Sequence, residues 1–198
     1  MSLMIDIRKL STFNRMAKEG ANTVADHLSQ MTGTETRMEI TKINFVETDD
    51  LQRHVGDDTE VGINIQLTEP PYGYVLMLFT ETSAKNIADL MMGGMGGGDH
   101  DGFSEMEMSA VQEIGNIMTS GFIDGWANVL DTTIDMTTPE FSHKPAAEIV
   151  DSLVGDRDDE IAMVFDSHIY APDADVEAKI YCFPELEELV EMMNSLEV

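Results

Sequence analysis

The stretch SEMEMSAVQEIGNIMTSGFIDGWANVL, residues 104–130, predicts one long helix with two different faces. Ser104 and Glu107 have the spacing of a capping box, which marks the start of the helix. Apolar and very small residues recur at spacings of three and four, as expected for a buried side: Val111, Ile114, Met118, Gly121, Phe122 and Gly125. Polar residues recur in the same way on another side: Ser109, Glu113, Asn116 and Ser120. Because burial does not require this polar stripe, the neighbouring residues Glu113 and Asn116 are the candidate functional pair.

The residues before this helix predict a helix, a long strand, a hairpin and a second helix. The first helix covers residues 6–31 and is stopped by Thr32-Gly33-Thr34, and the strand covers 35–47 with a bulge or bend near Lys42. Strict alternation over 61–67 and a continuous apolar run over 74–79 predict two antiparallel strands. The helix over residues 84–92 then begins with Thr82 or Ser83 as its cap.

The residues after the long helix predict a similar series of elements. A strand over 131–136 is ended by Pro139 or confined by it to a sheet edge, and a short helix covers 145–153. Strands over 161–170 and 176–183 form a second pair, and Pro184 suits the first turn of a terminal helix. Residues 93–102, six of them glycine, form a linker. This linker lacks the Gly-Lys-Ser/Thr ending of a phosphate-binding loop and the ligand series of a calcium loop.

The two halves also share an acid/amide pair. Glu113 lies 94 residues after Glu19, and Asn116 lies 94 residues after Asn22. The chain is therefore predicted to be a single domain, residues 1–198, built of two repeats over about 6–92 and 104–196 that the linker joins. A solvated helix face explains any single Glu/Asn pair, whereas the recurrence of the pair at the start of two similar modules makes a functional pair an equal alternative.

The composition excludes several classes of partner. The formal charge is −27, from 38 acidic and 11 basic residues, so neither nucleic acid nor an anionic membrane surface is an expected partner. The acidic residues are spread along the chain as a solvation coat, which suits a high-salt cytoplasm. Cys182 is the single cysteine, which fits a reducing compartment. No window has the roughly 18 consecutive apolar residues of a membrane span, so we expect a cytoplasmic protein.

Four residues of the second half resemble the motif of the CheC/CheX/FliY family of chemotaxis phosphatases. That motif is Asp or Ser, three residues, Glu, two residues, Asn, twenty-two residues and Pro, and Ser109, Glu113, Asn116 and Pro139 match it with this spacing. The first half keeps Glu19 and Asn22 of the motif. It has Arg15 where Asp or Ser is expected and Phe45 where Pro is expected. Two acid/amide pairs in one chain resemble CheC more than the single-site CheX.

The resemblance implies an α+β fold with a pseudo-two-fold internal duplication, in which one shared antiparallel sheet carries two long helices on a face. It implies an enzyme that hydrolyses the aspartyl phosphate of a phosphorylated CheY-type response regulator. Asn116 would position the attacking water and Glu113 would pair with a lysine of the regulator, with Glu19 and Asn22 as a second catalytic pair and Ser109 and Pro139 as supporting residues. A carboxamide suits this task because it can donate to and accept from one water.

We expect this chain to have no cofactor of its own, because the Mg²⁺ ion would belong to the regulator. The five histidines, His27, His54, His100, His143 and His168, are scattered and predict no metal site. The alternative function is a non-catalytic adaptor that binds CheD, phosphorylated CheY or both. A flagellar switch component is less favoured, because nothing here resembles an added motor-binding domain. We expect a monomer from a halophilic archaeon.

Overall fold

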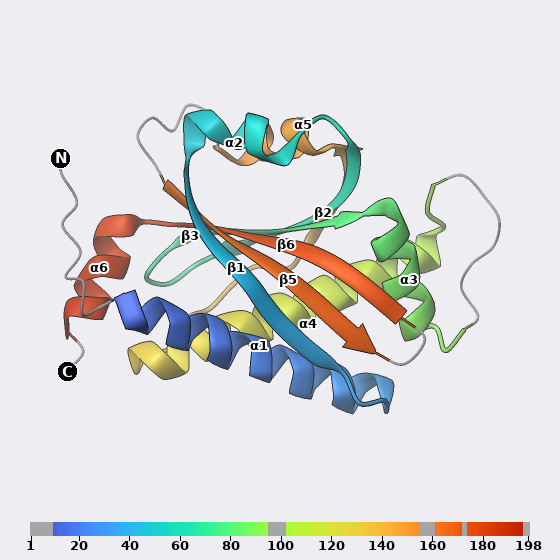
Figure 1. The fold of residues 1–198 in the computed structure, drawn as a ribbon, viewed down its shortest axis with the longest axis horizontal. Helices are drawn as coiled ribbons and strands as arrows, with labels where there is room; N and C mark the ends of the chain where they lie inside the picture. The colour runs from blue at the N-terminus through green and yellow to red at the C-terminus, as the bar shows by residue number, and fades with distance from the viewer. Residues whose placement is uncertain (1–9, 95–101, 155–160, 172–173, 196–198) are drawn as a thin grey trace.

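The computed structural model describes residues 10–94, 102–154, 161–171 and 174–195, which form six helices and six strands around one sheet (Figure 1). In chain order the elements are α1 (Leu10–Thr32), β1 (Arg37–Glu47), α2 (Thr48–Val55), β2 (Thr59–Leu67), β3 (Gly73–Thr80), α3 (Glu81–Met91), α4 (Glu105–Leu130), β4 (Glu140–Pro145), α5 (Ala146–Val154), β5 (Ile161–Ala171), β6 (Ala174–Pro184) and α6 (Leu186–Ser195). The strand order is β1-β5-β6-β3-β2-β4, and every neighbouring pair is antiparallel. The edge strands are therefore β1 and β4.

The order of elements is the same in both halves of the chain. Each half gives helix, strand, helix, strand, strand, helix, and exchanging the halves reverses the strand order onto itself. The pseudo-two-fold axis therefore passes between β3 and β6. The predicted fold class, an internally duplicated α+β domain with one shared antiparallel sheet, is confirmed. The repeat boundaries stay a prediction, since residues 95–101 of the expected linker lie outside the described residues.

The sheet is covered on both faces, which explains the continuous apolar run of its central strand β3. Val75, Met77 and Phe79 belong to the larger core cluster, which they share with α1 and α4. Leu76 and Leu78 belong to a second cluster, which lies under α2 and α5. Figure 1 shows α2 and α5 over one end of the sheet and the pair α1 and α4 across the other side. A strand buried on both faces needs apolar side chains at every position.

Glycines let the two long helices approach each other closely. A Cβ atom added at Gly121 would lie 2.9 Å from the backbone nitrogen of Val24, and one added at Gly125 would collide with the backbone of Gly20. Because Gly20 meets residue 125 and Val24 meets residue 121, the helices run antiparallel. The small residues on the apolar stripe of residues 104–130 are thus a packing requirement at the crossing with α1.

The structure confirms several local predictions. The Ser104 side chain accepts a hydrogen bond from the Glu107 backbone N–H, and the Glu107 carboxylate accepts one from the Ser104 N–H at 2.8 Å. The register of β1 against β5 shifts between Ile40 and Lys42, as expected for a bulge. The predicted strands of both hairpins and the terminal helix are present, with Leu189 and Met193 of α6 buried.

Three local predictions were wrong or incomplete. Residues 131–136 form no strand beyond one isolated bridge from Met136 to Leu67, and the strand β4 instead begins directly after Pro139. Proline has no N–H for a ladder, so it fits just outside the edge strand. The helix α2 was missed, because its short charged sequence lacks a long apolar period. The helix α3 is capped by Thr80, whose side chain accepts from the Ser83 N–H at 3.1 Å, and so begins earlier than expected.

None of the described helices has both the length and the apolar character needed to cross a bilayer. Cys182 lies buried in β6 as a free thiol, and burial raises the pKa of that thiol.

Candidate functional site

The polar stripe of α4 faces outward because the opposite side of the helix is fixed on the sheet. A Cβ atom at Gly115 would collide with the Ile63 side chain of β2, so the helix lies against this strand at its closest possible distance. Ile114 is fully buried beside it. With that side fixed, Glu113 is exposed and Asn116 is half-buried one turn later. Rigid helix packing therefore sets the direction of both side chains.

The segment that carries Pro139 is held by the end of β2. The Thr68 N–H donates to the Asp135 carbonyl at 2.8 Å, and the Thr137 N–H donates to the Gln66 carbonyl at 2.9 Å. The Gln66 N–H donates in turn to the Thr137 hydroxyl oxygen at 3.1 Å. These bonds place residues 135–139 alongside α4 although they form no regular strand.

The second depression, as we call the surface hollow between α4 and residues 136–139, brings the four motif residues together. Its volume is about 600 Å³ and it is open to solvent. Its lining residues are Ser109, Gln112, Glu113, Asn116, Ser120, Met136, Thr137, Thr138 and Pro139. Gln112 connects the two walls, since its side-chain amide donates to the Pro139 carbonyl at 3.4 Å. The Ser120 hydroxyl donates to the Asn116 backbone carbonyl at 2.6 Å, so this bond does not engage the Asn116 carboxamide.

The first depression, between α1 and the edge strand β1, holds only part of the first acid/amide pair. It has a volume of about 640 Å³ and is lined by Asn14, Ala17, Lys18, Ala21, Asn22 and residues 38–43. Asn22 is exposed there, whereas Glu19 is exposed on α1 and is not among the lining residues. Arg15 is exposed on the same helix. Phe45 packs edge-on against Phe13 at a centroid distance of 5.5 Å.

Several lining residues were missed by sequence reasoning. Gln112 stands three residues after Ser109 on the same helix face, so the helical period could have identified it. Thr137 and Thr138 could not be identified, because the sequence wrongly predicted a strand over 131–136 and so did not indicate that the residues after it lie alongside α4.

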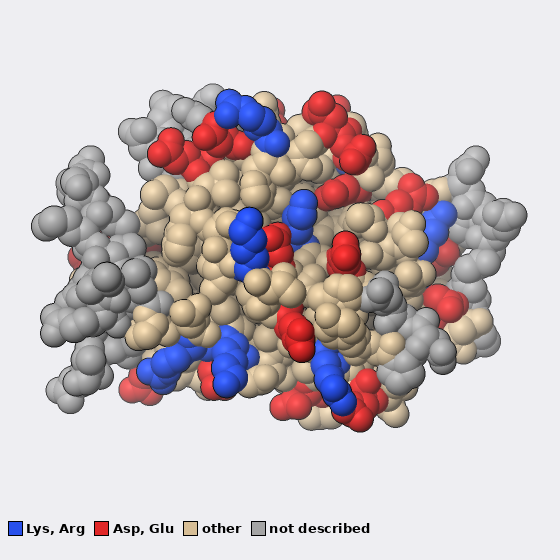
Figure 2. Space-filling model, viewed as in Figure 1, with Lys and Arg blue, Asp and Glu red and all other residues tan. Residues whose placement is uncertain are grey.

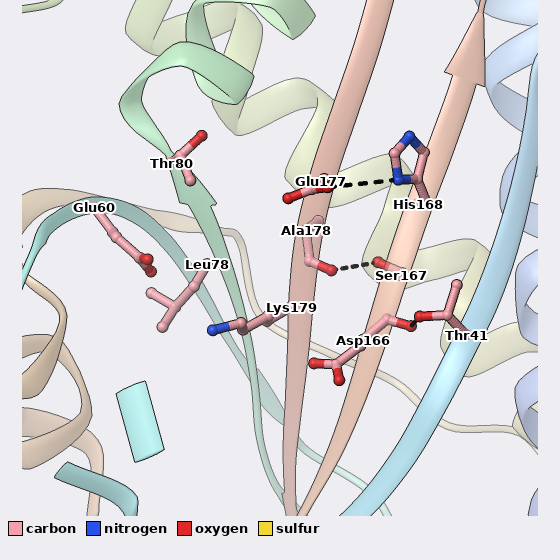
Figure 3. A pocket seen from close by; sticks show the side chains of 10 residues that line it. All are labelled: Thr41, Glu60, Leu78, Thr80, Asp166, Ser167, His168, Glu177, Ala178 and Lys179. Atoms are coloured by element: carbon pink, nitrogen blue, oxygen red, sulfur yellow. Dashed lines mark hydrogen bonds and ion pairs between the residues drawn. The ribbon is translucent and has the colours of Figure 1, made fainter. Parts of the chain in front are cut away.

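A third hollow of about 440 Å³ opens on the face of the sheet away from α1 and α4 (Figure 3). Figure 3 shows the charged ends of Glu60 and Lys179 extending into it from β2 and β6. The Nδ1 atom of His168 lies 3.9 Å from the Glu177 carboxylate. Burial raises the pKa of the Glu60 carboxyl, which Lys179 opposes and Asp58 reinforces. The Ser167 hydroxyl donates to the Ala178 carbonyl at 2.7 Å, so in this arrangement it does not donate to a side-chain base.

Within the described ranges, no three His, Cys, Asp or Glu side chains are grouped so that they could hold a metal ion. Three histidines, His54, His143 and His168, contact other side chains of the chain. For example, His54 packs edge-on against Tyr181, and His168 stacks on Tyr170 at a centroid distance of 4.2 Å.

Comparison with known proteins identifies similar sequences and similar folds. A family model described as the CheC-like family matches residues 106–143, which contain all four motif residues. The chain is 54% identical over 196 residues to a Halobacterium salinarum protein named "Putative CheY-P phosphatase CheC1", with 99% of this chain and 100% of that protein aligned. Residues of this chain are also 35% identical over 79 positions to the Bacillus subtilis flagellar motor switch phosphatase FliY, which is 40% of this chain and 21% of that protein.

A solved structure supports the fold over nearly the whole chain. Thermotoga maritima FliY superposes with a TM-score of 0.78, covering 97% of this chain and 96% of that chain. The sequence identity of 17% means that this likeness concerns the fold alone.

Proposed function

The chain belongs to the CheC-like family, and we propose that it is a phosphatase that hydrolyses the aspartyl phosphate of a CheY-type response regulator. The names of its relatives, a CheY-P phosphatase and a flagellar motor switch phosphatase, support a phosphatase role. The finer assignment concerns the substrate and the residues that act on it.

One observation carries this assignment. Asn116 and Pro139 are 23 residues apart in the chain, yet they line one open hollow together with Ser109 and Glu113. The hollow is shallow and exposed, so it suits a protein surface better than a small molecule, which usually binds in a deep and mostly apolar cleft. A helix face that presents an amide can enter the active site of a partner.

The proposed reaction needs little covalent chemistry from this chain. A water oxygen attacks phosphorus, the bond between phosphorus and the aspartate oxygen breaks, and the aspartate leaves as a carboxylate. Both protons of the water stay on the phosphate product, which is released as dihydrogen phosphate. An acyl phosphate is already reactive, so the main requirement is a water held in line. The Asn116 carboxamide can accept from this water through its oxygen and donate through its nitrogen.

Glu113 would hold the two proteins in register. It is exposed one helical turn before Asn116, at a position where its carboxylate can meet a lysine of the regulator. Such a contact is a charge-assisted hydrogen bond, stronger than a neutral one. The Mg²⁺ ion that neutralises phosphoryl charge would be held by the regulator.

The test is phosphate release from a phosphorylated CheY-type regulator, with and without the purified chain. We expect the chain to accelerate release and Asn116→Ala to remove most of the acceleration. Asn128→Ala is the matched control, since Asn128 is an exposed asparagine near the other end of α4. Acceleration that persists in Asn116→Ala would contradict the role of Asn116.

The adaptor function predicts a different result from the same proteins. A chain that binds the phosphorylated regulator or CheD without accelerating phosphate release would be an adaptor, and the phosphatase proposal would be wrong. Binding and release measured on one sample separate the two functions.

A further inference from the structure

A fourth hollow, of about 540 Å³, lies between β2, β4 and α5 on the face of the sheet away from α1 and α4. Asn64 is paired in register with Leu76, which packs under α2 and α5, so the Asn64 side chain lies on the α5 side of the sheet. Gln66 of β2 and Ser142 of β4 lie on the same side, because side chains alternate along a strand. The helix α5 lines the hollow with Ile149, Ser152 and Leu153.

The fourth hollow and the second depression share a wall. Thr137 and Thr138 line both of them, although one opens beside α5 and the other beside α4. The Thr137 N–H donates to the Gln66 carbonyl at 2.9 Å, and the Gln66 N–H donates to the Thr137 hydroxyl oxygen at 3.1 Å. A molecule in the fourth hollow that contacts these threonines therefore touches the same residues that border the proposed catalytic site.

The fourth hollow also holds polar groups that have no partner within the described chain. The Asn64 carboxamide forms no hydrogen bond with a described residue, and its Oδ1 atom is buried. An unpaired buried polar atom is unfavourable. The soft χ2 torsion of asparagine lets either end of the carboxamide turn toward the hollow. Lys144 and Glu140, which also line it, form no salt bridge with a described residue.

The charges around the fourth hollow favour an uncharged ligand. One carboxylate and one ammonium group line it, those of Glu140 and Lys144, so their charges balance. Glu148 and Asp151 are exposed on α5, and Figure 2 shows acidic side chains gathered at the upper end of the molecule, which α2 and α5 form. These acids repel an anion, and Lys144 repels a cation. The other polar lining groups are amides and hydroxyls, which match a ligand hydroxyl as donor and as acceptor.

We propose that the fourth hollow binds a small uncharged polyhydroxyl compound, of the size of a mono- or disaccharide, and that the bound compound acts on the second depression through Thr137 and Thr138. Each hydroxyl of such a compound can donate and accept, which suits the unpaired Asn64 carboxamide. The volume lies within the range of small-molecule sites, about 300–1,000 Å³. The binding does not depend on the proposed function, whereas its effect on the regulator rests on that function.

The test of binding is a titration of the full chain with glucose and with trehalose, followed by amide NMR. It is run at a salt concentration at which circular dichroism shows every variant folded. We expect saturable shifts of the Ser152 and Thr137 amides with a Kd on the order of 1 mM. Asn64→Ala should raise this Kd on the order of tenfold, because the carboxamide no longer bonds to the ligand.

Asn44→Ala is the matched control. Asn44 stands in the same row of the sheet as Asn64, on the edge strand β1, and is half-buried like it. It lines neither the fourth hollow nor the second depression, so this variant should titrate like the unmodified chain. Glucosamine, a cation, and gluconate, an anion, test the charge of the ligand, and we expect both to bind more weakly than glucose.

The coupling is tested with the regulator activated by beryllium trifluoride, a stable substitute for the aspartyl phosphate. We expect saturating glucose to change the affinity of the chain for this regulator about fivefold or more. Because coupling between two sites is reciprocal, the activated regulator should change the Kd for glucose by the same factor.

The outcomes separate this inference from the proposed function. If neither sugar gives saturable shifts, or if Asn64→Ala binds glucose as tightly as Asn44→Ala does, the site is wrong and the phosphatase stands. Tighter binding of glucosamine or gluconate would overturn the uncharged class of ligand. Saturable binding that leaves the affinity for the regulator unchanged would overturn the coupling. A chain that binds glucose but does not accelerate phosphate release would keep the site and make the phosphatase proposal wrong.

Discussion

The two depressions occupy related positions at opposite edges of one sheet. The first lies between α1 and the edge strand β1, and the second lies between α4 and the segment that precedes the edge strand β4. They differ in the residues that line them. The second contains an acid and an amide together, with Pro139 linked to the helix through Gln112. The first contains the amide Asn22 and Lys18, while Glu19 stands outside it. Their asparagines are separated along the antiparallel helices by about seven residues, or roughly 10 Å.

The difference shows that repeating a residue pair does not by itself repeat a site. On the first side, β1 runs beside α1 as one strand of 11 residues with a single bulge between Ile40 and Lys42. On the second side, residues 135–139 bond irregularly to the end of β2 before β4 begins. The wall that faces each asparagine is therefore different, and this wall decides which side chains share its hollow.

The largest effect is expected from the paired substitutions Asn116→Ala and Asn22→Ala. Asn116→Ala should lower the rate of phosphate release on the order of 100-fold, because a misplaced water loses its in-line geometry. Asn22→Ala should lower the rate only a few-fold, since Glu19 does not share its depression. Steady-state phosphate-release assays on both variants measure this ratio. Equal losses in the two variants would break the comparison and make the sites equivalent.

The helix crossing supports both depressions, so Gly125→Ala should affect them together. The new methyl group would collide with the backbone of Gly20. We expect the free energy of unfolding to fall by about 1–3 kcal/mol, as is common for an overpacked core. Denaturant unfolding followed by circular dichroism measures the change. The exposed neighbour Asp124→Ala is the control, and an unchanged midpoint for Gly125→Ala would mean that the helices can separate without cost.

The substitution Gln112→Ala should have a smaller effect on the rate, and one that is confined to the second depression. Gln112→Ala removes the 3.4 Å hydrogen bond to the Pro139 carbonyl, and we expect kcat to fall about fivefold through less precise placement of the wall. Gln112 is a positioning residue, so KM and the melting temperature should stay close to their original values. Gln30→Ala, at an exposed position of α1, is the control. A change in melting temperature without a change in kcat would assign Gln112 a purely structural role.

The smallest effect is expected from Glu60, which lines the hollow on the face of the sheet away from α1 and α4 and belongs to neither depression. Burial raises the pKa of Glu60 above its ordinary value of 4.5, so the protonated form favours the fold. That stability is full below pH 4.5 and is lost as the pH rises through the folded-state pKa. Glu60→Gln should therefore raise the melting temperature at pH 7, and the gain should disappear near pH 4.5. A gain that is constant with pH would exclude titration of Glu60 as its cause, and phosphate release should not change.

Much of the fold follows from local sequence patterns. The capping box at Ser104, the alternation in β2 and the apolar run in β3 predict their elements, because these signals depend on neighbouring residues alone. The same holds for the polar stripe of Glu113 and Asn116, which a helical period places on one face. The segment 131–136 was mistaken for a strand, since its backbone partners are set by β2 and not by its own residues.

The sequence by itself determined that this chain carries two acid/amide pairs on two long helices and that one pair matches a four-residue motif. Only the tertiary structure decided that Pro139 and Gln112 meet across the second depression and that Glu19 stands outside the first. The physical reason is that a helical period fixes which residues share a face, whereas the contents of a hollow depend on the strand or segment that packs opposite that face.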